Sequence, residues 1–326
     1  MHSLLPVIEK FCAVRLLVIG DLMLDRFVWG EVERLSPEAP VPVLRVVSEN
    51  FSLGGAANVI HNICALGGKA TACGIVGPDE AGRRILKALQ KVGASTAGVC
   101  IDRRFQTIEK SRVIASPHHQ QIVRLDREDR QPVGERTAKR LAGFILANAS
   151  RFDAIIVSDY GKGAVGDQTL AAVARAVGKR KLCVIDPKKE NYERYRVPAV
   201  LTPNKNEASE ASGITIVDEA SLNAAGKKLL RKWRAAAVLI TRGAEGMSLF
   251  RPRAPVKNFS TEARDVFDVT GAGDTVVAVC ALALASGAGY DNAAVLANLA
   301  AGFVGDEVGT VAVKNAQLRR AIKEKS

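Results

Sequence analysis

Short apolar runs alternate with amphipathic segments from about residue 134 onward, and this alternation constrains the fold more than any other feature of the sequence. The apolar runs, which are predicted strands, are residues 154–157, 182–185, 199–202 and 237–241. The amphipathic segments, which are predicted helices, are residues 134–148, 166–177 and 218–233. Strands that alternate with helices along a chain build a parallel sheet covered by helices on both faces. The sequence therefore predicts an α/β protein with a mostly parallel central sheet.

The first half of the chain extends this pattern and then departs from it. The added strands are residues 14–19 and 70–76, and the added helices are residues 54–66 and 80–92. The segments of about 27–50 and 105–127 instead alternate with a period of two, which is typical of strands with one exposed face. We expect these two segments to form a small lid of four or five strands, inserted in a single domain of residues 1–326.

The composition is that of an ordinary globular protein. Of the 326 residues, 48% are hydrophobic and 25% are charged, which excludes a disordered chain. The net charge of +12 would suit nucleic acid, an anionic membrane or phosphorylated small molecules. Only 5% of the residues are aromatic, whereas proteins that stack bases carry aromatic side chains among their basic ones. We therefore expect neither nucleic acid nor a membrane as a partner, and most basic residues on solvated faces.

Cysteine usage and the absence of long apolar stretches indicate where the protein works. The six cysteines form no C-x-x-C pair and nearly all lie in apolar runs, so we expect buried free thiols in a reducing compartment. No apolar stretch reaches 18 residues, and the first residues lack the basic and apolar parts of a signal peptide. The sequence thus predicts a cytoplasmic protein.

A glycine-rich turn, residues 268–274, runs directly into the apolar segment 275–285. This segment is rich in Ala and Leu without two-residue alternation, so we expect a helix buried on all sides. The first turn of such a helix offers free backbone N–H groups to an anion, and Gly271 and Gly273 would let the anion come close. Asp274 places one carboxylate in the same turn. The pattern fits phosphoryl transfer to a hydroxyl, and it equally fits a turn that only packs a core helix.

Polar or glycine residues follow five predicted strands. Asp21 and Asp25 follow the first, and the later groups are residues 158–163, 186–189, 203–207 and 242–246. Open α/β sheets bind ligands outside the carboxyl ends of their strands, so five such ends indicate one ligand crevice. In the predicted lid, Lys110, Arg112 and Arg124 share one face, which would suit an anion or be an ordinary charged surface.

Four motifs, in this order, resemble the PfkB (ribokinase-like) family of sugar kinases. They are Gly54-Gly55 with Asn58, Asn204-x-x-Glu207, TRGAEG at 241–246 and DVTGAGD at 268–274, the last of which departs from the commoner form at Val269. The resemblance covers essentially the whole chain. It implies a ribokinase-like three-layer sandwich with a mostly parallel central sheet and a small β-strand lid.

The family resemblance implies roles for particular residues in a phosphoryl transfer that uses ATP and Mg²⁺. Asp274 would be the general base, and the amides of Gly271, Ala272 and Gly273 would stabilise the transferring phosphoryl group. Asn204 and Glu207 would organise the waters around Mg²⁺, although both residues also suit a helix cap. The residues expected to bind the nucleotide are Thr241, Gly243, Gly246 and Asn298.

Within this family, the chain resembles the kinases that phosphorylate the anomeric (C1) hydroxyl of D-glycero-β-D-manno-heptose 7-phosphate to the 1,7-bisphosphate, for lipopolysaccharide core synthesis. The stretches that carry this resemblance are residues 20–25, 36–43, 158–163 and 268–274. It implies that Asp21, Gly55 and Asn58 hold sugar hydroxyls, and that the lid pairs two subunits into a homodimer. Candidates for binding the 7-phosphate are Lys110, Arg112, Arg124, Lys162 and Lys188.

Several alternatives stay open. The chain could be a kinase for another phosphorylated sugar, such as fructose 1-phosphate or fructose 6-phosphate. It could also be a non-catalytic sugar or nucleotide sensor, or bind nucleic acid, although the intact Asp274 and Glu207 argue against an inactive kinase. Some heptose kinases are fused to a nucleotidyltransferase that carries H-x-G-H. The four histidines do not form this motif, so we expect a stand-alone kinase without adenylylation activity.

Overall fold

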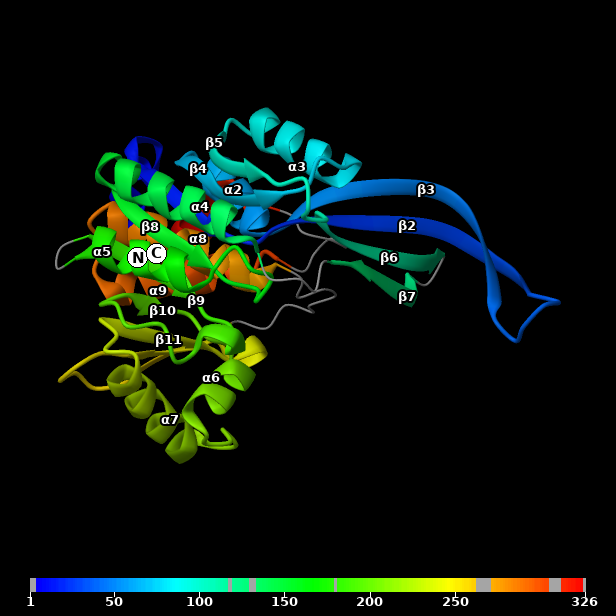
Figure 1. Cartoon of the computed structure of the whole chain (residues 1–326). Coiled ribbons are helices and arrows are strands. Elements are labelled where there is room, and N and C mark those ends of the chain that lie inside the picture. The colour runs from blue at the N-terminus through cyan, green and yellow to red at the C-terminus, as the bar shows by residue number, and fades with distance from the viewer. Residues whose placement is uncertain are drawn as a thin grey trace.

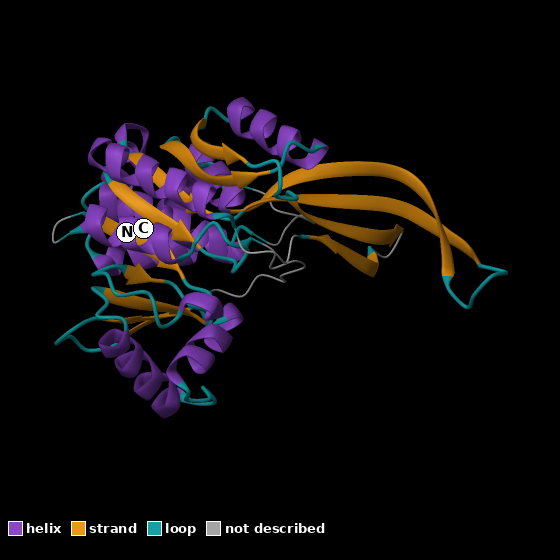
Figure 2. Ribbon diagram, viewed as in Figure 1, coloured by secondary structure: helices purple, strands orange, loops and turns teal. Residues whose placement is uncertain are grey.

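The computed structural model describes residues 4–116, 119–128, 133–178, 181–261, 271–304 and 312–324. The strands in this part of the chain form a nine-stranded central sheet and a four-stranded second sheet (Figure 1). Helices cover both faces of the central sheet, and the second sheet projects from the body that they form (Figure 2). The predicted α/β architecture with a lid is therefore confirmed.

The central sheet has the strand order β13-β12-β11-β10-β9-β8-β1-β4-β5. Its strands are β1 (Arg15–Gly20), β4 (Lys69–Val76), β5 (Ser95–Ile101), β8 (Ala154–Ser158), β9 (Leu182–Asp186), β10 (Val200–Leu201), β11 (Ala237–Thr241), β12 (Met247–Phe250) and β13 (Lys257–Phe259). Neighbours from β5 to β11 pair in parallel, whereas β12 and β13 add in antiparallel fashion at one edge. The sheet is thus mostly parallel, as predicted.

Two hydrophobic clusters lie on opposite faces of this sheet, and alternate residues of β1 enter each. Leu16 and Val18 belong to one cluster, and Leu17 and Ile19 to the other, because successive side chains of a strand point to opposite faces. The first cluster includes residues of α1 (Leu5–Glu9), α2 (Ala56–Ala65), α3 (Glu80–Lys91), α8 (Ala272–Ala285), α9 (Tyr290–Ala301) and α10 (Asn315–Glu324). The second includes residues of α4 (Glu135–Asn148), α5 (Asp167–Val177), α6 (Lys205–Ser212) and α7 (Glu219–Lys232). Short 3₁₀ turns complete the chain as η2 (Lys10–Ala13), η3 (Ala149–Arg151), η4 (Lys189–Asn191) and η5 (Gly243–Glu245).

Helix α8 is the buried helix that the composition predicts after the glycine-rich turn. Every residue from Asp274 to Ala283 is buried, and the helix packs against α2 and α9. Gly271 stands immediately before it with φ of 87°, a left-handed conformation that glycine adopts without steric cost. The preceding residues of the motif, 268–270, lie outside the described residues.

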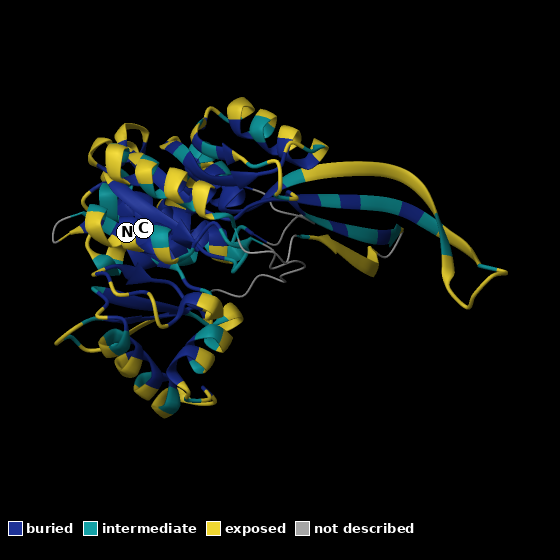
Figure 3. Ribbon diagram, in the orientation of Figure 1, coloured by how far each residue is buried: buried dark blue, intermediate teal, exposed yellow. Residues whose placement is uncertain are grey.

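The second sheet, which we call the lid, has the order β3-β2-β6-β7. Its strands are β2 (Leu22–Leu35), β3 (Pro42–Gly55), β6 (Ile108–Ser116) and β7 (Gln120–Arg127). β2 begins one residue after the end of β1, so the lid leaves the body directly at the carboxyl edge of the central sheet (Figure 1). The β2–β3 hairpin reaches farthest from the body, and β3 is exposed along most of its length (Figure 3).

The cysteine prediction is wrong for one residue. All six thiols are free, and Cys73, Cys100, Cys183 and Cys280 are buried. Cys64 is half-buried, but Cys12 is exposed, because it lies in η2, where Phe11 is the residue that enters the core. Among the described residues, the helices are all too short or too polar to cross a membrane.

Candidate active site

The carboxyl ends of β1, β8 and β9 lie side by side in the central sheet. Gly20 is in register with Ser158, and Ser158 with Asp186, so the residues that follow these strands gather at one edge. The lid begins at the same edge with β2. Ligands of open α/β sheets bind at such an edge, and several of the predicted site residues lie here.

Asp274 lies in the first turn of α8 and is 3% exposed. The side-chain amide of Asn58, from α2, donates a hydrogen bond to its Oδ2 at 2.8 Å. The hydroxyl of Tyr160, from the loop after β8, donates to its Oδ1 at 2.7 Å. Burial raises the pKa of Asp274 to about 6, and these two hydrogen bonds oppose that rise. Such a carboxylate is mostly ionised at pH 7 and has the strength that a general base needs.

The N-terminus of α8 is open toward an anion. Among the described residues, no side chain caps its first amides. Within the part of the chain that the structure describes, a Cβ added at Gly273 would meet no atom within 4 Å, so no side chain packs against the helix at this position. The amides of Ala272 and Gly273 stand next to Asp274 in the chain, and the helix dipole favours negative charge there. The predicted residues Gly271, Ala272 and Gly273 therefore have the geometry of an anion-binding helix start.

Asp21 holds a loop in place. Its Oδ2 accepts hydrogen bonds from the backbone amides of Tyr160 (2.9 Å) and Lys162 (3.1 Å), and its Oδ1 accepts one from Ala164 (2.9 Å). Burial raises the pKa of Asp21, while the same amides act to lower it. Three of the roughly four lone-pair positions of the carboxylate are thereby occupied, which leaves little capacity for a sugar hydroxyl.

Gly55 and Asn58 occupy the start of α2, next to the lid. Gly55 has φ of 55°, and a Cβ there would stand 2.6 Å from the carbonyl oxygen of Asp21. Glycine is required at this junction because both the conformation and the close approach exclude a side chain. Asn58 is 1% exposed and bonds directly to Asp274. The structure thus brings Asn58 to the carboxylate, whereas Gly55 shapes the backbone.

The five basic candidates differ in whether a carboxylate already neutralises them. The ion pairs are Arg112–Asp25 at 2.6 Å, Arg124–Asp126 at 2.8 Å, Lys162–Glu128 at 2.7 Å and Lys188–Glu207 at 3.2 Å. No carboxylate of the described residues pairs with Lys110, whose ammonium lies 5.5 Å from the centre of the Tyr160 ring. Burial lowers the pKa of Lys110, and the nearby Asp25 acts against this. Lys110 is therefore the basic candidate with charge to offer a ligand.

Asn204 and Glu207 form a capping box at the start of α6. The Glu207 amide donates to Asn204 Oδ1 at 2.9 Å, and the Asn204 amide donates to Glu207 Oε2 at 3.0 Å. The capping alternative is thus confirmed. The other oxygen of Glu207 accepts from Lys188 at 3.2 Å.

Asp186, at the end of β9, joins this group although the sequence did not single it out. Burial raises its pKa well above the ordinary range, and the carboxylates of Glu207 and Asp274 raise it further. The shift places the carboxyl group of Asp186 near those of Glu207 and Asp274. The available signal was its position at the end of a buried strand, which Asp186 shares with many structural residues. The described residues contain no cluster of three or more metal-type side chains.

The predicted nucleotide residues lie around the end of β11. Thr241 ends that strand and pairs with Asn204 in an isolated bridge. Gly243 and Gly246 both have positive φ; a Cβ at Gly243 would meet open space, whereas one at Gly246 would stand 1.9 Å from the carbonyl oxygen of Phe259. Asn298 donates from its side chain to the Ser260 carbonyl at 2.9 Å and accepts from the Thr261 hydroxyl at 3.1 Å. Gly246 and Asn298 therefore already serve packing, and Gly243 borders free space.

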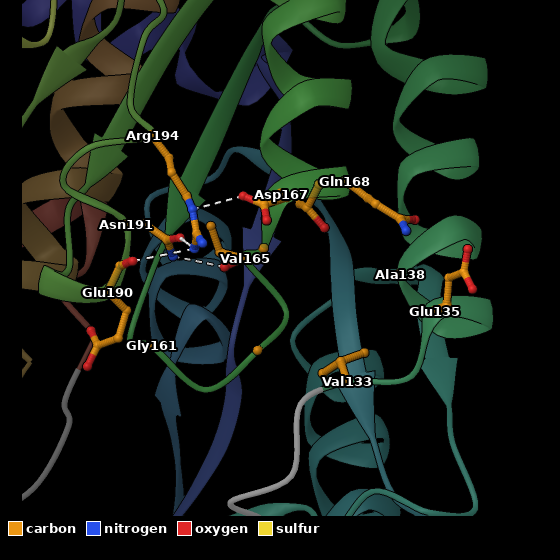
Figure 4. Close-up of a pocket in the computed structure, with 13 residues that line it drawn as sticks. Val133, Glu135, Ala138, Gly161, Val165, Asp167, Gln168, Glu190, Asn191 and Arg194 are labelled. Carbon is orange, nitrogen blue, oxygen red and sulfur yellow. Dashed lines mark hydrogen bonds and ion pairs between the residues drawn. The ribbon is translucent and has the colours of Figure 1, made fainter.

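A separate cavity of about 440 Å³ lies between the amino-terminal ends of α4 and α5 and the turn η4 (Figure 4). Arg194 spans it, with an ion pair of 2.8 Å to Asp167 and a hydrogen bond of 2.8 Å to Asn191. Gly161 and Gly163 of the predicted strand-end group 158–163 line this cavity, but none of the individually predicted catalytic, nucleotide or sugar residues does. The acid, the amides and the free cation thus gather elsewhere, at the N-terminus of α8.

Residues 14–316 match the profile of the pfkB family carbohydrate kinases. The chain belongs to the pfkB family of carbohydrate kinases. This pfkB kinase is accordingly a phosphotransferase with an alcohol group as acceptor. Family membership shows the class of reaction, and the role of the glycine-rich turn in it stays a prediction.

Two bacterial proteins named bifunctional protein HldE are similar to this pfkB kinase. That of Geobacter metallireducens is 48% identical over 306 residues, and that of Geobacter sulfurreducens is 47% identical over 307 residues. Each comparison covers 94% of this chain and 62% of the relative. The chain therefore spans less than two thirds of the length of these relatives.

Solved structures share the fold at low sequence identity. Ribokinase of Arabidopsis thaliana, in complex with ribose and ATP, has a TM-score of 0.74 and 19% identity and covers 95% of this chain and 99% of its own. Phosphofructokinase-2 of Escherichia coli, in complex with substrates and products, has a TM-score of 0.77 and 17% identity, with coverage of 95% and 99%. These similarities establish the ribokinase-like fold of this pfkB kinase.

Proposed function

We propose that the chain is an ATP-dependent kinase for the C1 hydroxyl of D-glycero-β-D-manno-heptose 7-phosphate, with the 1,7-bisphosphate as product, in lipopolysaccharide core precursor synthesis. The observation that carries the proposal is the buried Asp274 carboxylate at the open N-terminus of α8. Support for the heptose comes from the resembling stretches of sequence and from the identity of 47–48% to the two HldE proteins.

Asp274 would accept the proton of the attacking hydroxyl. The C1 hydroxyl gives its proton to this carboxylate while its oxygen forms a bond to the γ-phosphorus of ATP and the bond from that phosphorus to ADP breaks. A pKa of about 6 suits this step, because the carboxylate is ionised at pH 7 and still basic. A positioned base of this kind contributes about 10²- to 10⁴-fold in rate. Asn58 and Tyr160 hold the two oxygens of the base.

The N-terminus of α8 and the lid would stabilise the negative charge on the transferring phosphoryl group. The amides of Gly271, Ala272 and Gly273 would donate to its oxygens, and fixed donors of this kind need no reorganisation during reaction. Lys110 would add a positive charge from the lid. A lid over the sugar also excludes water, which limits hydrolysis of ATP. Of the three residues predicted to hold sugar hydroxyls, Asn58 is the one we retain for such a contact, because Asp21 is occupied by backbone amides and Gly55 shapes the backbone.

The Asn204–Glu207 region fits the magnesium ion that accompanies ATP in such kinases. Mg²⁺ neutralises charge on the β- and γ-phosphates when it is bound. Glu207 and Asp186 are close enough for their charges to interact, and Asn204 fixes Glu207 through the capping box. Two carboxylates are sufficient, because Mg²⁺ usually keeps several waters and takes only one or two carboxylates from the protein. The nucleotide itself would lie along Thr241, Gly243 and Gly246, with Asn298 at its edge.

The proposal is tested by a panel of sugar phosphates with the purified protein and ATP. We expect heptose 7-phosphate to give the highest kcat/KM, above fructose 1-phosphate and fructose 6-phosphate. Asp274→Asn should bind ATP normally and lower kcat at least about 100-fold. Asp167→Asn is the control, because Asp167 is an exposed aspartate of another helix.

Two results would contradict the proposal in different ways. If a fructose phosphate were preferred, the proposed substrate would be wrong, but the proposed kinase reaction would still hold. Near-normal turnover by Asp274→Asn would remove Asp274 from the role of base.

A further inference from the structure

Tyr160 reaches the carboxylate of Asp274 from an element that lies far from it in the sequence. Its hydroxyl donates to Asp274 Oδ1 at 2.7 Å, and it comes from the loop between β8 and α5. The remaining oxygen, Oδ2, is held by Asn58 at 2.8 Å. Each oxygen of the proposed base therefore has one donor, and the two donors come from separate elements, α2 and the loop after β8.

Two buried carboxylates fix the loop that carries Tyr160. Asp21 accepts the amides of Tyr160, Lys162 and Ala164, and Asp159 accepts the amide of Gly161 at 2.8 Å. Asp159 is itself held by the hydroxyl of Tyr195 and the side chain of Asn191, both at 2.6 Å. The backbone on both sides of Tyr160 is thus tied to the body, which fixes the position from which its side chain reaches Asp274.

We propose that Tyr160 is a positioning residue that, together with Asn58, fixes the rotation of the Asp274 carboxylate toward the sugar hydroxyl. A carboxylate that is held at one lone pair of each oxygen cannot turn about its Cβ–Cγ bond, so its remaining lone pairs keep one direction. Proton transfer depends steeply on such alignment. This inference rests on the proposed role of Asp274 as the base.

The hydroxyl also stabilises the ionised form of Asp274. Among the residues that the structure describes, the titratable or charged groups that face Asp274 are Tyr160, Asp25 from β2, Lys110 from β6 and Asp186 from β9. Burial and Asp25 raise the pKa of Asp274, whereas Tyr160, Asn58 and Lys110 lower it. Loss of the Tyr160 hydroxyl therefore raises this pKa. Since the base works only when it is ionised, the fall of activity at low pH must then begin at a higher pH.

The test compares Tyr160→Phe with Tyr192→Phe in the full chain, by steady-state kinetics from pH 5 to pH 9. Tyr192→Phe is the matched control, because its hydroxyl is buried and has no hydrogen-bond partner among the described residues. For Tyr160→Phe we expect kcat at pH 7 to fall about tenfold, and the acid limb of kcat/KM to move up by about one pH unit. KM for ATP should stay unchanged, and thermal unfolding should show both variants folded.

The outcomes separate this role from the proposed function. An unchanged acid limb and kcat in Tyr160→Phe, with Asp274→Asn inactive, would overturn the role of Tyr160 alone. A rise in KM for the sugar phosphate without loss of kcat would also overturn it, since the hydroxyl would then bind substrate directly. Near-normal turnover by Asp274→Asn would overturn the proposed base, and the role of Tyr160 with it.

Discussion

At the scale of single residues, a basic side chain can bind a phosphorylated ligand best when no carboxylate already pairs with it. Lys110 has no carboxylate partner within the described residues, whereas Arg124, on the same face of the lid, is paired with Asp126. We expect Lys110→Met to lower kcat/KM for the sugar phosphate at least about tenfold, since a hydrogen bond to a charged group is lost. Arg124→Met should change it less than about threefold.

This ranking is checked by measuring kcat and KM of both variants, first with varied sugar phosphate and then with varied ATP. A loss mainly in KM for the sugar would assign Lys110 to the 7-phosphate. A loss mainly in kcat would assign it to the transferring group. A larger effect of Arg124→Met than of Lys110→Met would contradict the argument from ion pairing.

The sequence could place residues at the carboxyl edge of the sheet, but it could not give their hydrogen bonds. Strand ends pointed correctly to Asp21 and Thr241 as residues of the carboxyl edge, because strand direction alone puts them there. The carboxylate of Asp21 accepts three backbone amides from a loop 139 to 143 residues away, and the sequence does not show the path of that loop. Tyr160 was missed as a partner of Asp274 for the same reason, since no local pattern encodes a contact across 114 residues.

At the scale of elements, helices α6 and α7 each begin with a capping box, but the two boxes lie in different surroundings. Asn204 and Glu207 form the capping box of α6, and Asp218 and Ser221 form that of α7. Only the first stands beside Asp186. We expect Asn204→Ala and Asp218→Ala each to lower the free energy of unfolding by about 1 kcal/mol, the usual cost of a lost cap.

The two caps should differ in their effect on magnesium. Asn204→Ala should raise the Mg²⁺ concentration that half-saturates turnover, because Glu207 loses its fixed position, and Asp218→Ala should not. Denaturant unfolding and Mg²⁺ titration of the kinase rate check both parts. An equal effect of the two variants on the Mg²⁺ dependence would leave Asn204 as a structural cap only.

Elements with strong local signals were predictable, and those defined by their neighbours were not. The uniform apolar composition of α8 predicted a buried helix, and ten of its residues are buried. β12 and β13 have four and three residues, too few to show a period, and exist because β11 offers them an edge. β5 carries Gly98 within a mixed sequence and is the opposite edge of the sheet.

At the scale of the whole molecule, the lid has two unlike faces. Lys110 and Arg112 share one face with Asp25, and this face is turned toward Tyr160. On the other face, Val28, Val113 and Val123 form a row across β2, β6 and β7. This row is continued by side chains that are exposed in the single chain, namely Val46 (52%), Leu125 (47%) and Phe51 (36%). The same face also carries the ion pairs Arg26–Glu49 and Arg127–Glu109, so it is apolar only in part. We propose that residues 1–326 form one kinase domain and that this face pairs two copies of it.

The proposed homodimer predicts a specific loss on mutation. Val123 is 42% exposed and ends that row on the edge strand β7, so Val123→Asp would place a charge in the interface, which is costly without a partner. Val217→Asp is the control, because Val217 is 75% exposed and lies outside the lid. By sedimentation, we expect wild type and Val217→Asp to have twice the chain mass of 34.7 kDa, and Val123→Asp to shift toward that single mass. A monomeric wild type at micromolar concentration would contradict the pairing. A dimer that survives Val123→Asp would place the interface on another surface of the molecule.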